Sequence, residues 1–159
     1  MKAFIERAAW LYATVGGVGM LRPAPGTWGS IPGFLMAWWA THSGWPMGWV
    51  ALATVIALCL AIPAATITAR KMQKKDPGSI VADEAFAVPV GVWPLMASGI
   101  TDWRWWSCAF VLYRILDILK PWPARQLERL PEGTGIVVDD VASAAWCGLL
   151  VWLALRWWG

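Results

Sequence analysis

The chain has 159 residues, of which 58% are hydrophobic and only 14% are charged, and its formal net charge is +3 at pH 7. This length predicts a single domain over residues 1–159, and the small net charge argues against nucleic-acid binding. Because its three cysteines lie inside apolar runs and it has a single histidine, we expect no disulfide framework, zinc site, or Ser/His or Cys/His catalysis.

The hydropathy pattern is typical of a membrane protein. The 47 residues from Pro23 to Ala69 contain no Asp, Glu, Lys or Arg, which is rare in a soluble domain but normal for two helices of roughly 20 residues that cross a bilayer. The 15 tryptophans cluster near the ends of apolar runs, where an interfacial aromatic belt would place them. A Trp-rich soluble core is the alternative interpretation.

Taken in chain order, the pattern predicts an all-α fold: a compact helical membrane protein with about five membrane-embedded helices. An amphipathic helix over Lys2–Thr14 leads into a Gly/Pro-rich loop over Gly16–Ser30. The expected embedded helices are Ile31–Thr41, Met47–Ile67, Ala85–Ile100 (broken by Pro89 and Pro94), Trp105–Leu119 and Val141–Trp157.

A cluster of basic residues sets the expected orientation. Arg70, Lys71, Lys74 and Lys75 lie close together between two expected helices, and the positive-inside rule places such a cluster in the cytoplasm. Alternation through five helices then puts residues 2–30, 70–84 and 120–140 on the same side. We therefore expect the polar motifs, and with them the active site, at the cytoplasmic interface.

Two adjacent carboxylate pairs, Asp83-Glu84 and Asp139-Asp140, stand beside apolar runs. Carboxylates at the edge of hydrocarbon are costly to desolvate, so they need a cation or a proton. Hard oxygen ligands of this kind favour Mg²⁺. We expect a helix N-cap at Asp76-Pro77, which would put Asp83 about two turns into its helix, and a flexible Gly133–Gly135 before the second pair. Charges that merely favour a helix start are the alternative.

The segment Arg114–Pro123 carries charged residues at steps of three, namely Arg114, Asp117 and Lys120. On a helix they share one stripe. The neighbours of Asp117 are apolar, and an acid in apolar membrane surroundings is a functional candidate. A structural Arg114–Asp117 ion pair is the alternative.

The tract Arg22–Ser30 combines restricted prolines with permissive glycines. As a loop, it could aim backbone N–H groups and the hydroxyls of Thr27 and Ser30 at a phosphate group. A simple connecting loop is the alternative, because Gly/Pro loops are common.

Taken together, these motifs resemble the phosphatidylglycerophosphatase A family. The family pattern is present, in the family's order, as Pro25-Gly26-Thr27-Trp28-Gly29-Ser30, Val81-Ala82-Asp83-Glu84, Arg114 through Pro123, and Asp139-Asp140. The match runs from about Gly16 to Gly148. It departs from the family at Ala87 and at Ser143-Ala144, where one small residue replaces another.

The resemblance implies a Mg²⁺-dependent phosphatase of the bacterial inner membrane, multi-pass, with its active site facing the cytoplasm. It would remove the terminal phosphate of phosphatidylglycerophosphate to give phosphatidylglycerol, so its partners are a phospholipid substrate and the bilayer. The residues expected to hold Mg²⁺, directly or through water, are Asp83, Glu84, Asp139 and Asp140. The expected catalytic residues are Asp83, Asp117, Asp139 and Asp140, and the expected phosphate-binding residues are Arg114, Lys120, Thr27 and Ser30.

Two questions stay open at this point. Direct attack by water and a covalent aspartyl-phosphate both suit these residues. The alternative function is a small membrane transport or scaffold protein with structural intramembrane charges. A CDP-alcohol phosphotransferase would need an Asp-Gly-x-x-Ala-Arg core, which the chain lacks.

Overall fold

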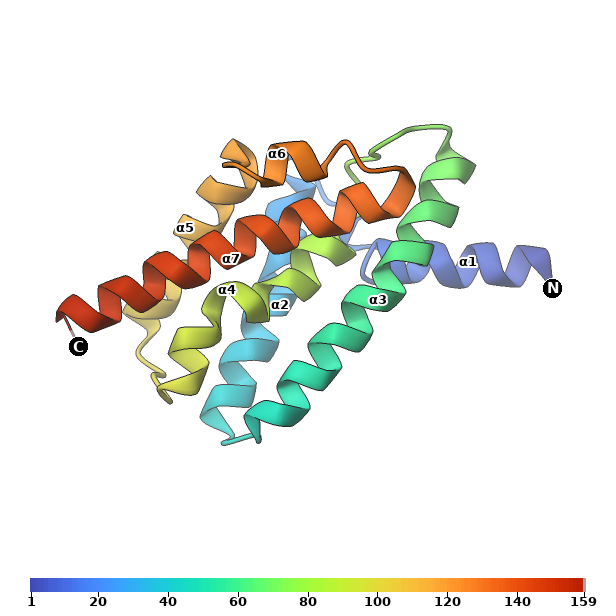
Figure 1. Ribbon diagram of the computed structural model, residues 1–159. Coiled ribbons are helices and arrows are strands. Elements are labelled where there is room, and N and C mark those ends of the chain that lie inside the picture. Colours follow the sequence, from blue (N-terminus) through green and yellow to red (C-terminus); the bar gives the residue numbers. More distant parts are fainter. Residues whose placement is uncertain (159) are drawn as a thin grey trace.

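A computed structural model describes residues 1–158, and within these residues every regular element is a helix, as the sequence predicted. Figure 1 shows the arrangement. The elements are α1 (Lys2–Ala13), the short 3₁₀ helix η1 (Val18–Met20), α2 (Pro25–His42), α3 (Met47–Met72), α4 (Ala82–Ala97), α5 (Trp103–Leu119), α6 (Ala124–Leu127) and α7 (Glu132–Trp158).

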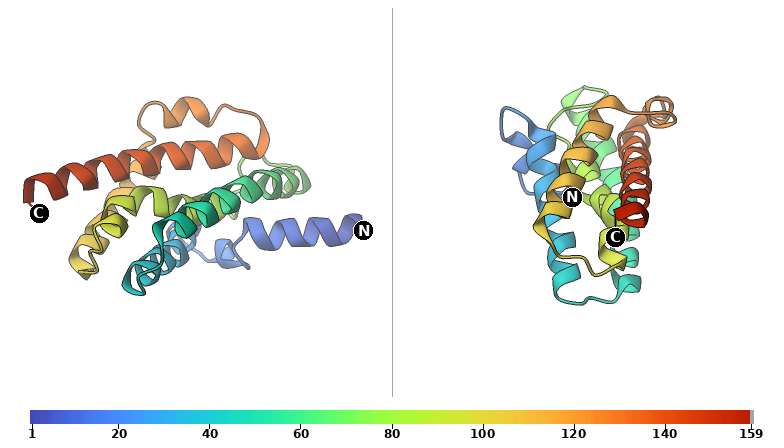
Figure 2. Two further views of the ribbon diagram at one scale, coloured as in Figure 1. Left: turned by 60° about the horizontal axis from the view of Figure 1, so that its bottom comes forward. Right: turned by 90° about the vertical axis from the view of Figure 1, so that its left-hand side faces the viewer.

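Helix α4 is the centre of the bundle, and α2, α3, α5 and α7 pack around it. Helices α2, α4 and α7 begin at the end of the bundle where α3 and α5 finish, and α6 lies at that same end (Figures 1 and 2). Segments far apart in sequence therefore meet there: residues 25–30, 73–84, 114–128 and 132–140. This convergence agrees with the alternation inferred from the sequence.

The central helix stays continuous although it contains Pro89 and Pro94, so the expected break is wrong. Each proline lacks an N–H and leaves the carbonyl four residues earlier, on Ala85 or Val90, without its helical donor. Glycines of the neighbouring helices lie against these two oxygens. A Cβ on Gly33 of α2 would collide with the Ala85 carbonyl, and one on Gly148 of α7 with the Val90 carbonyl. Their Cα–H groups therefore face oxygens that the prolines left free.

The starts of α2 and α4 differ from the sequence-based expectation. Helix α2 already begins at Pro25, a residue favoured in the first helical turn, so the tract containing Thr27 and Ser30 is helical and the phosphate-cradling loop is wrong. Helix α4 begins at Ala82 instead of near Asp76, which places Asp83 and Glu84 in its first turn.

Helix α7 also begins earlier than predicted, at Glu132. The stretch Gly133–Gly135, expected to be flexible, is therefore helical. A Cβ on Gly133 would collide with the backbone carbonyl of Ile62 in α3, so this glycine serves close helix packing instead of flexibility. As a result, the pair Asp139-Asp140 is buried about two turns inside α7 and does not lie at the helix start.

Two helices in the described part of the chain, α3 and α7, are long and apolar enough to cross a membrane by length and composition. Helices α4 and α5 have 16 and 17 residues, or about 24–26 Å, which is short of a hydrocarbon core of ~30 Å. Along α3, large apolar side chains such as Trp49, Leu52 and Ile56 are exposed. The number of full crossings stays a prediction.

Candidate active site

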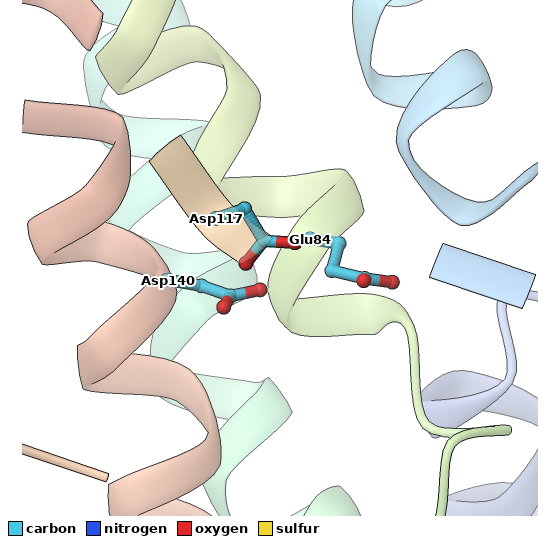
Figure 3. A group of neighbouring side chains, drawn as sticks. All are labelled: Glu84, Asp117 and Asp140. Atoms are coloured by element: carbon cyan, nitrogen blue, oxygen red, sulfur yellow. The ribbon is translucent and has the colours of Figure 1, made fainter. Parts of the chain in front are cut away.

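Three carboxylates from three different helices meet at the polar end of the bundle. Glu84 of α4, Asp117 of α5 and Asp140 of α7 each place an oxygen within 4.8 Å of the others. Asp117 lies between the other two side chains (Figure 3). Asp117 and Asp140 are buried and Glu84 is half-buried. Like charges this close repel strongly in a low dielectric, so the cluster needs positive charge to stay ionised.

Part of that charge comes from Arg114, one turn before Asp117 on α5. Its Nη1 lies 2.8 Å from Asp117 Oδ2, 3.2 Å from Glu84 Oε1 and 3.1 Å from the hydroxyl of Ser30. The Arg114–Asp117 ion pair, which was the alternative interpretation of this motif, is present, and it belongs to a network that joins α2, α4 and α5.

Ser30 on α2 is fully buried and contacts the guanidinium group of Arg114. Its hydroxyl donates to the Gly26 carbonyl at 2.9 Å. Because a serine hydroxyl has a single hydrogen, its oxygen can only accept from Arg114. Gly26 lies in the same contact, since a Cβ there would collide with the Glu84 carboxylate. The glycine of this motif is therefore explained by close packing against the site.

The two carboxylate pairs share a local geometry. In each pair the first carboxylate accepts a hydrogen bond from the backbone N–H of the second residue, at 2.9 Å for Asp83–Glu84 and 2.9 Å for Asp139–Asp140. Only the second member of each pair, Glu84 or Asp140, enters the triad. Asp83 and Asp139 are buried beside it. Their predicted role as ligands, directly or through water, stays a prediction.

Lys120 supplies the second cation and follows the last residue of α5 in a left-handed conformation, with φ of 46°. Its ammonium group pairs with Asp139 and lies 3.6 Å from Glu128. Partial burial alone would lower the pKa of Lys120, but the hydrogen bond and charge of Asp139 outweigh it and raise that pKa above its usual value. Lys120 is therefore protonated at neutral pH.

These groups line a pocket of about 130 Å³. Seven carboxylates and two lysines line it together with Ile136: Asp76, Glu84, Asp117, Glu128, Glu132, Asp139, Asp140, Lys75 and Lys120. Thr27 and Ser30 are not among the lining residues, and their predicted phosphate contact stays a prediction. Asp76, Glu128 and Glu132 were not predicted from the sequence to be site residues. Their only signal was proximity to the basic cluster and to the Lys120 motif.

The donor set fits a divalent cation. Within residues 1–158, the buried oxygens Glu84 Oε2 and Asp140 Oδ2 have no hydrogen-bond partner. A buried charged oxygen without a partner is costly. Both atoms belong to residues of the triad, and carboxylate oxygens are the ligands that Mg²⁺ prefers. An ion held by Glu84, Asp117 and Asp140 would satisfy them.

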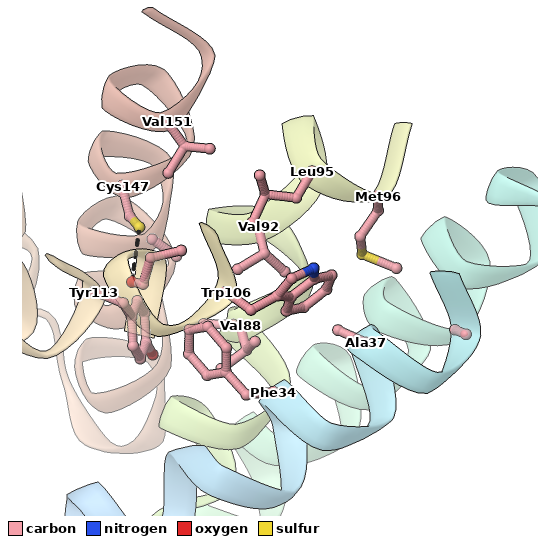
Figure 4. Packing of buried hydrophobic residues seen from close by; sticks show 14 of the residues in the cluster. Phe34, Ala37, Val88, Val92, Leu95, Met96, Trp106, Tyr113, Cys147 and Val151 are labelled. Atoms are coloured by element: carbon pink, nitrogen blue, oxygen red, sulfur yellow. Dashed lines mark hydrogen bonds between the residues drawn. The ribbon is translucent and has the colours of Figure 1, made fainter. Parts of the chain in front are cut away.

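A cluster of buried apolar residues packs next to the triad and connects the helices that carry it. Tyr113 is fully buried, and its hydroxyl donates to the backbone carbonyl of Glu84 at 3.0 Å. Its ring packs against Phe34 with centroids 5.9 Å apart, and Val88 lies beside them in the same cluster (Figure 4). Tyr113 thus links the core to the first turn of α4. Sequence spacing gave no signal for this contact, because its partners come from distant helices.

Comparison with known proteins gives consistent matches over most of the chain. The family model described as Phosphatidylglycerophosphatase A matches residues 11–155. The chain is 36% identical over 152 residues to Phosphatidylglycerophosphatase A of Escherichia coli strain K12, covering 93% of this chain and 85% of that protein. It is 36% identical over 146 residues to Phosphatidylglycerophosphatase A of Haemophilus influenzae, covering 89% and 85%.

A third relative bears a different name. This protein of Bacteroides thetaiotaomicron, provisionally named a phosphatidylinositol-3-phosphatase, is 33% identical over 162 residues, covering 96% of this chain and 98% of its own length. No solved structure matches the chain.

Proposed function

Since the chain belongs to the phosphatidylglycerophosphatase A family and is therefore a phosphatase, we propose that it hydrolyses phosphatidylglycerophosphate and uses Mg²⁺ as its cofactor. The products are phosphatidylglycerol and inorganic phosphate. The observation that carries this proposal is the triad of Glu84, Asp117 and Asp140, with two unpartnered buried oxygens. It lies beside the two cations Arg114 and Lys120.

Glu84, Asp117 and Asp140 would hold the ion, each from a different helix. When bound, Mg²⁺ neutralises the charge of the phosphate group and stabilises the charge that develops during phosphoryl transfer. The excess of carboxylates in the pocket supports this assignment, because an anionic phosphate would otherwise be repelled.

The protein's own cations bind and orient the phosphate oxygens. Arg114 offers a planar fork whose Nη1 is fixed by Ser30, Glu84 and Asp117, and Lys120 offers a point charge held by Asp139. Asp117 keeps Arg114 in place, or accepts the proton of the attacking water. In the overall reaction the water oxygen bonds to phosphorus, the bond from phosphorus to the glycerol oxygen breaks, and that oxygen takes up a proton.

The placement of the site suits a lipid phosphomonoester. We propose that α3 and α7 cross the bacterial inner membrane in a multi-pass arrangement, with the triad at the cytoplasmic interface. The basic residues Arg70, Lys71, Lys74 and Lys75 lie at the same end of the bundle as the triad, which supports this orientation. A phospholipid with its tails in the leaflet would present its headgroup at this depth.

Phosphate release from defined lipids tests the proposal. Purified enzyme in mixed micelles with Mg²⁺ should release phosphate from phosphatidylglycerophosphate faster than from phosphatidic acid or phosphatidylinositol 3-phosphate, and Asp140→Asn should serve as the inactive control. Release from none of the three lipids would favour a transport or scaffold role for the buried charges. Fastest release from phosphatidylinositol 3-phosphate would keep the reaction but change the substrate.

A further inference from the structure

An exposed apolar surface flanks the mouth of the acidic pocket. It consists of Ile118, Leu119 and Trp122, which are 73%, 65% and 72% exposed, and we refer to it as the α5–α6 lip. These residues lie next to residues of the site in the sequence. Asp117 and Lys120 line the pocket, while Ile118 and Leu119 between them point outward. Leu119 directly precedes Lys120, so the Cα atoms of the lip and of this lysine are about 3.8 Å apart.

The backbone keeps the lip apart from the pocket. Lys120 adopts the left-handed conformation that ends α5, and its side chain points inward to Asp139. The chain then turns through Pro121-Trp122-Pro123. The indole N–H of Trp146 on α7 donates to the Trp122 carbonyl at 2.8 Å. The lip is therefore tied to α7, and its apolar side chains stay exposed on a fixed support.

We propose that the α5–α6 lip seats in the acyl region of the leaflet that carries the substrate, and so holds the mouth of the pocket at headgroup depth. The inference rests on the proposed function for the nature of the substrate. The occupant follows from continuity with the site: the molecule to be bound is an amphiphile whose charged end lies against Lys120. The acyl chains of that molecule stay in the leaflet, so the acyl region of the leaflet is the occupant expected at the surface next to Lys120. An exposed tryptophan at the boundary of charged and apolar residues is also typical of a membrane interface.

The first test measures the position of the lip without using activity. A cysteine replaces Leu119 in a variant whose three native cysteines are changed to alanine, and it carries a bimane fluorophore in reconstituted vesicles. Nitroxide groups on the acyl chains of phosphatidylcholine should quench this fluorophore, and aqueous iodide should not. A bimane at position 126, in place of the exposed Gln126 of α6, is the matched control and should show the opposite pattern.

The second test connects the lip to turnover. Leu119→Asn should lower kcat/KM on dioleoyl phosphatidylglycerophosphate in vesicles on the order of 5- to 20-fold, because an apolar side chain in the leaflet is replaced by a polar one. Turnover of the dibutyryl lipid, dissolved as monomers, should be unchanged. Leu35→Asn makes the same change at a comparably exposed site (61%) on α2. Because α2 contributes no residue to the lining of the pocket, this variant should not displace the pocket mouth and should change neither rate. Melting in detergent checks the fold of both variants.

Each alternative outcome has a distinct meaning. Iodide quenching at position 119 would show that the lip lies in water, and shielding from both quenchers would show that a protein surface covers it; either result overturns the proposal. Equal loss on the monomeric and vesicle substrates would also overturn it. If the wild-type enzyme hydrolyses neither lipid, the proposed function fails, while the quenching result still decides the position of the lip.

Discussion

Replacing Arg114 by lysine keeps the positive charge but removes the planar fork, and it should nearly abolish catalysis. The Nη1 atom of Arg114 is shared by oxygens of Ser30, Glu84 and Asp117, at 3.1, 3.2 and 2.8 Å. These three oxygens belong to three different helices. A lysine ammonium on its unbranched chain cannot reproduce this arrangement and also face a phosphate group.

The magnitude follows from the contacts that are lost. Hydrogen bonds to charged groups contribute about 1.5–3 kcal/mol each, and a buried partner left unpaired adds a further cost. Loss of one such bond and misplacement of the phosphate-facing nitrogens corresponds to about 3–4 kcal/mol, or a fall in kcat/KM on the order of 10²- to 10³-fold.

Steady-state phosphate release from phosphatidylglycerophosphate, with melting in detergent, measures this effect. Arg125→Lys is the matched control, because Arg125 is exposed on α6, and it should retain wild-type kinetics. If Arg114→Lys stays within about 3-fold of wild type, the fork has no special role and Arg114 acts only through its charge.

Three further predictions concern packing, the apolar cluster next to the triad and topology. Gly26→Ala should lower both activity and melting temperature, since its Cβ would collide with the Glu84 carboxylate, whereas Gly48→Ala has open space around it and should behave as wild type; equal behaviour of the two variants would contradict the tight contact. Tyr113→Phe should destabilise the fold by about 0.5–1.5 kcal/mol through loss of the bond to the Glu84 carbonyl, and an unchanged melting curve would remove its role in fixing α4. A cysteine at Ser79 should resist impermeant thiol reagents in whole cells, and labelling from outside would reverse the proposed orientation.

The fold class was predictable because it depends on long-range composition. The stretch from Pro23 to Ala69 has no charged residue. In apolar surroundings, helices allow such a stretch to form all its backbone hydrogen bonds internally. The helix starts were less predictable. Helices α2 and α7 contain Gly26 and Gly133 in their first turns, where these glycines pack closely against Glu84 and against α3. Single-sequence propensity treats such glycines as loop residues.

The site was predictable at the level of motifs but not of atoms. The steps of three correctly brought Arg114 and Asp117 together on α5, whereas Lys120 lies just beyond the end of that helix in a left-handed conformation. The structure also brings Asp117 together with one member of each carboxylate pair. Which member enters the triad depends on backbone hydrogen bonds within each pair, and no pattern of residue types reveals these. The contact of Lys120 with Asp139 likewise depends on how α5 and α7 pack.

Glu84, Asp117 and Asp140 should together bind a divalent cation. Titration of purified enzyme with Mn²⁺, followed by the loss of the free-ion electron paramagnetic resonance signal and by competition with Mg²⁺, tests it without a substrate. The wild type should bind Mn²⁺ in competition with Mg²⁺. Glu84→Gln, Asp117→Asn and Asp140→Asn should each weaken binding by at least about 10-fold, while Asp102→Asn, at the exposed start of α5, should bind as the wild type does. Unchanged affinity in all three triad variants, or no binding by folded wild-type protein, would contradict the account.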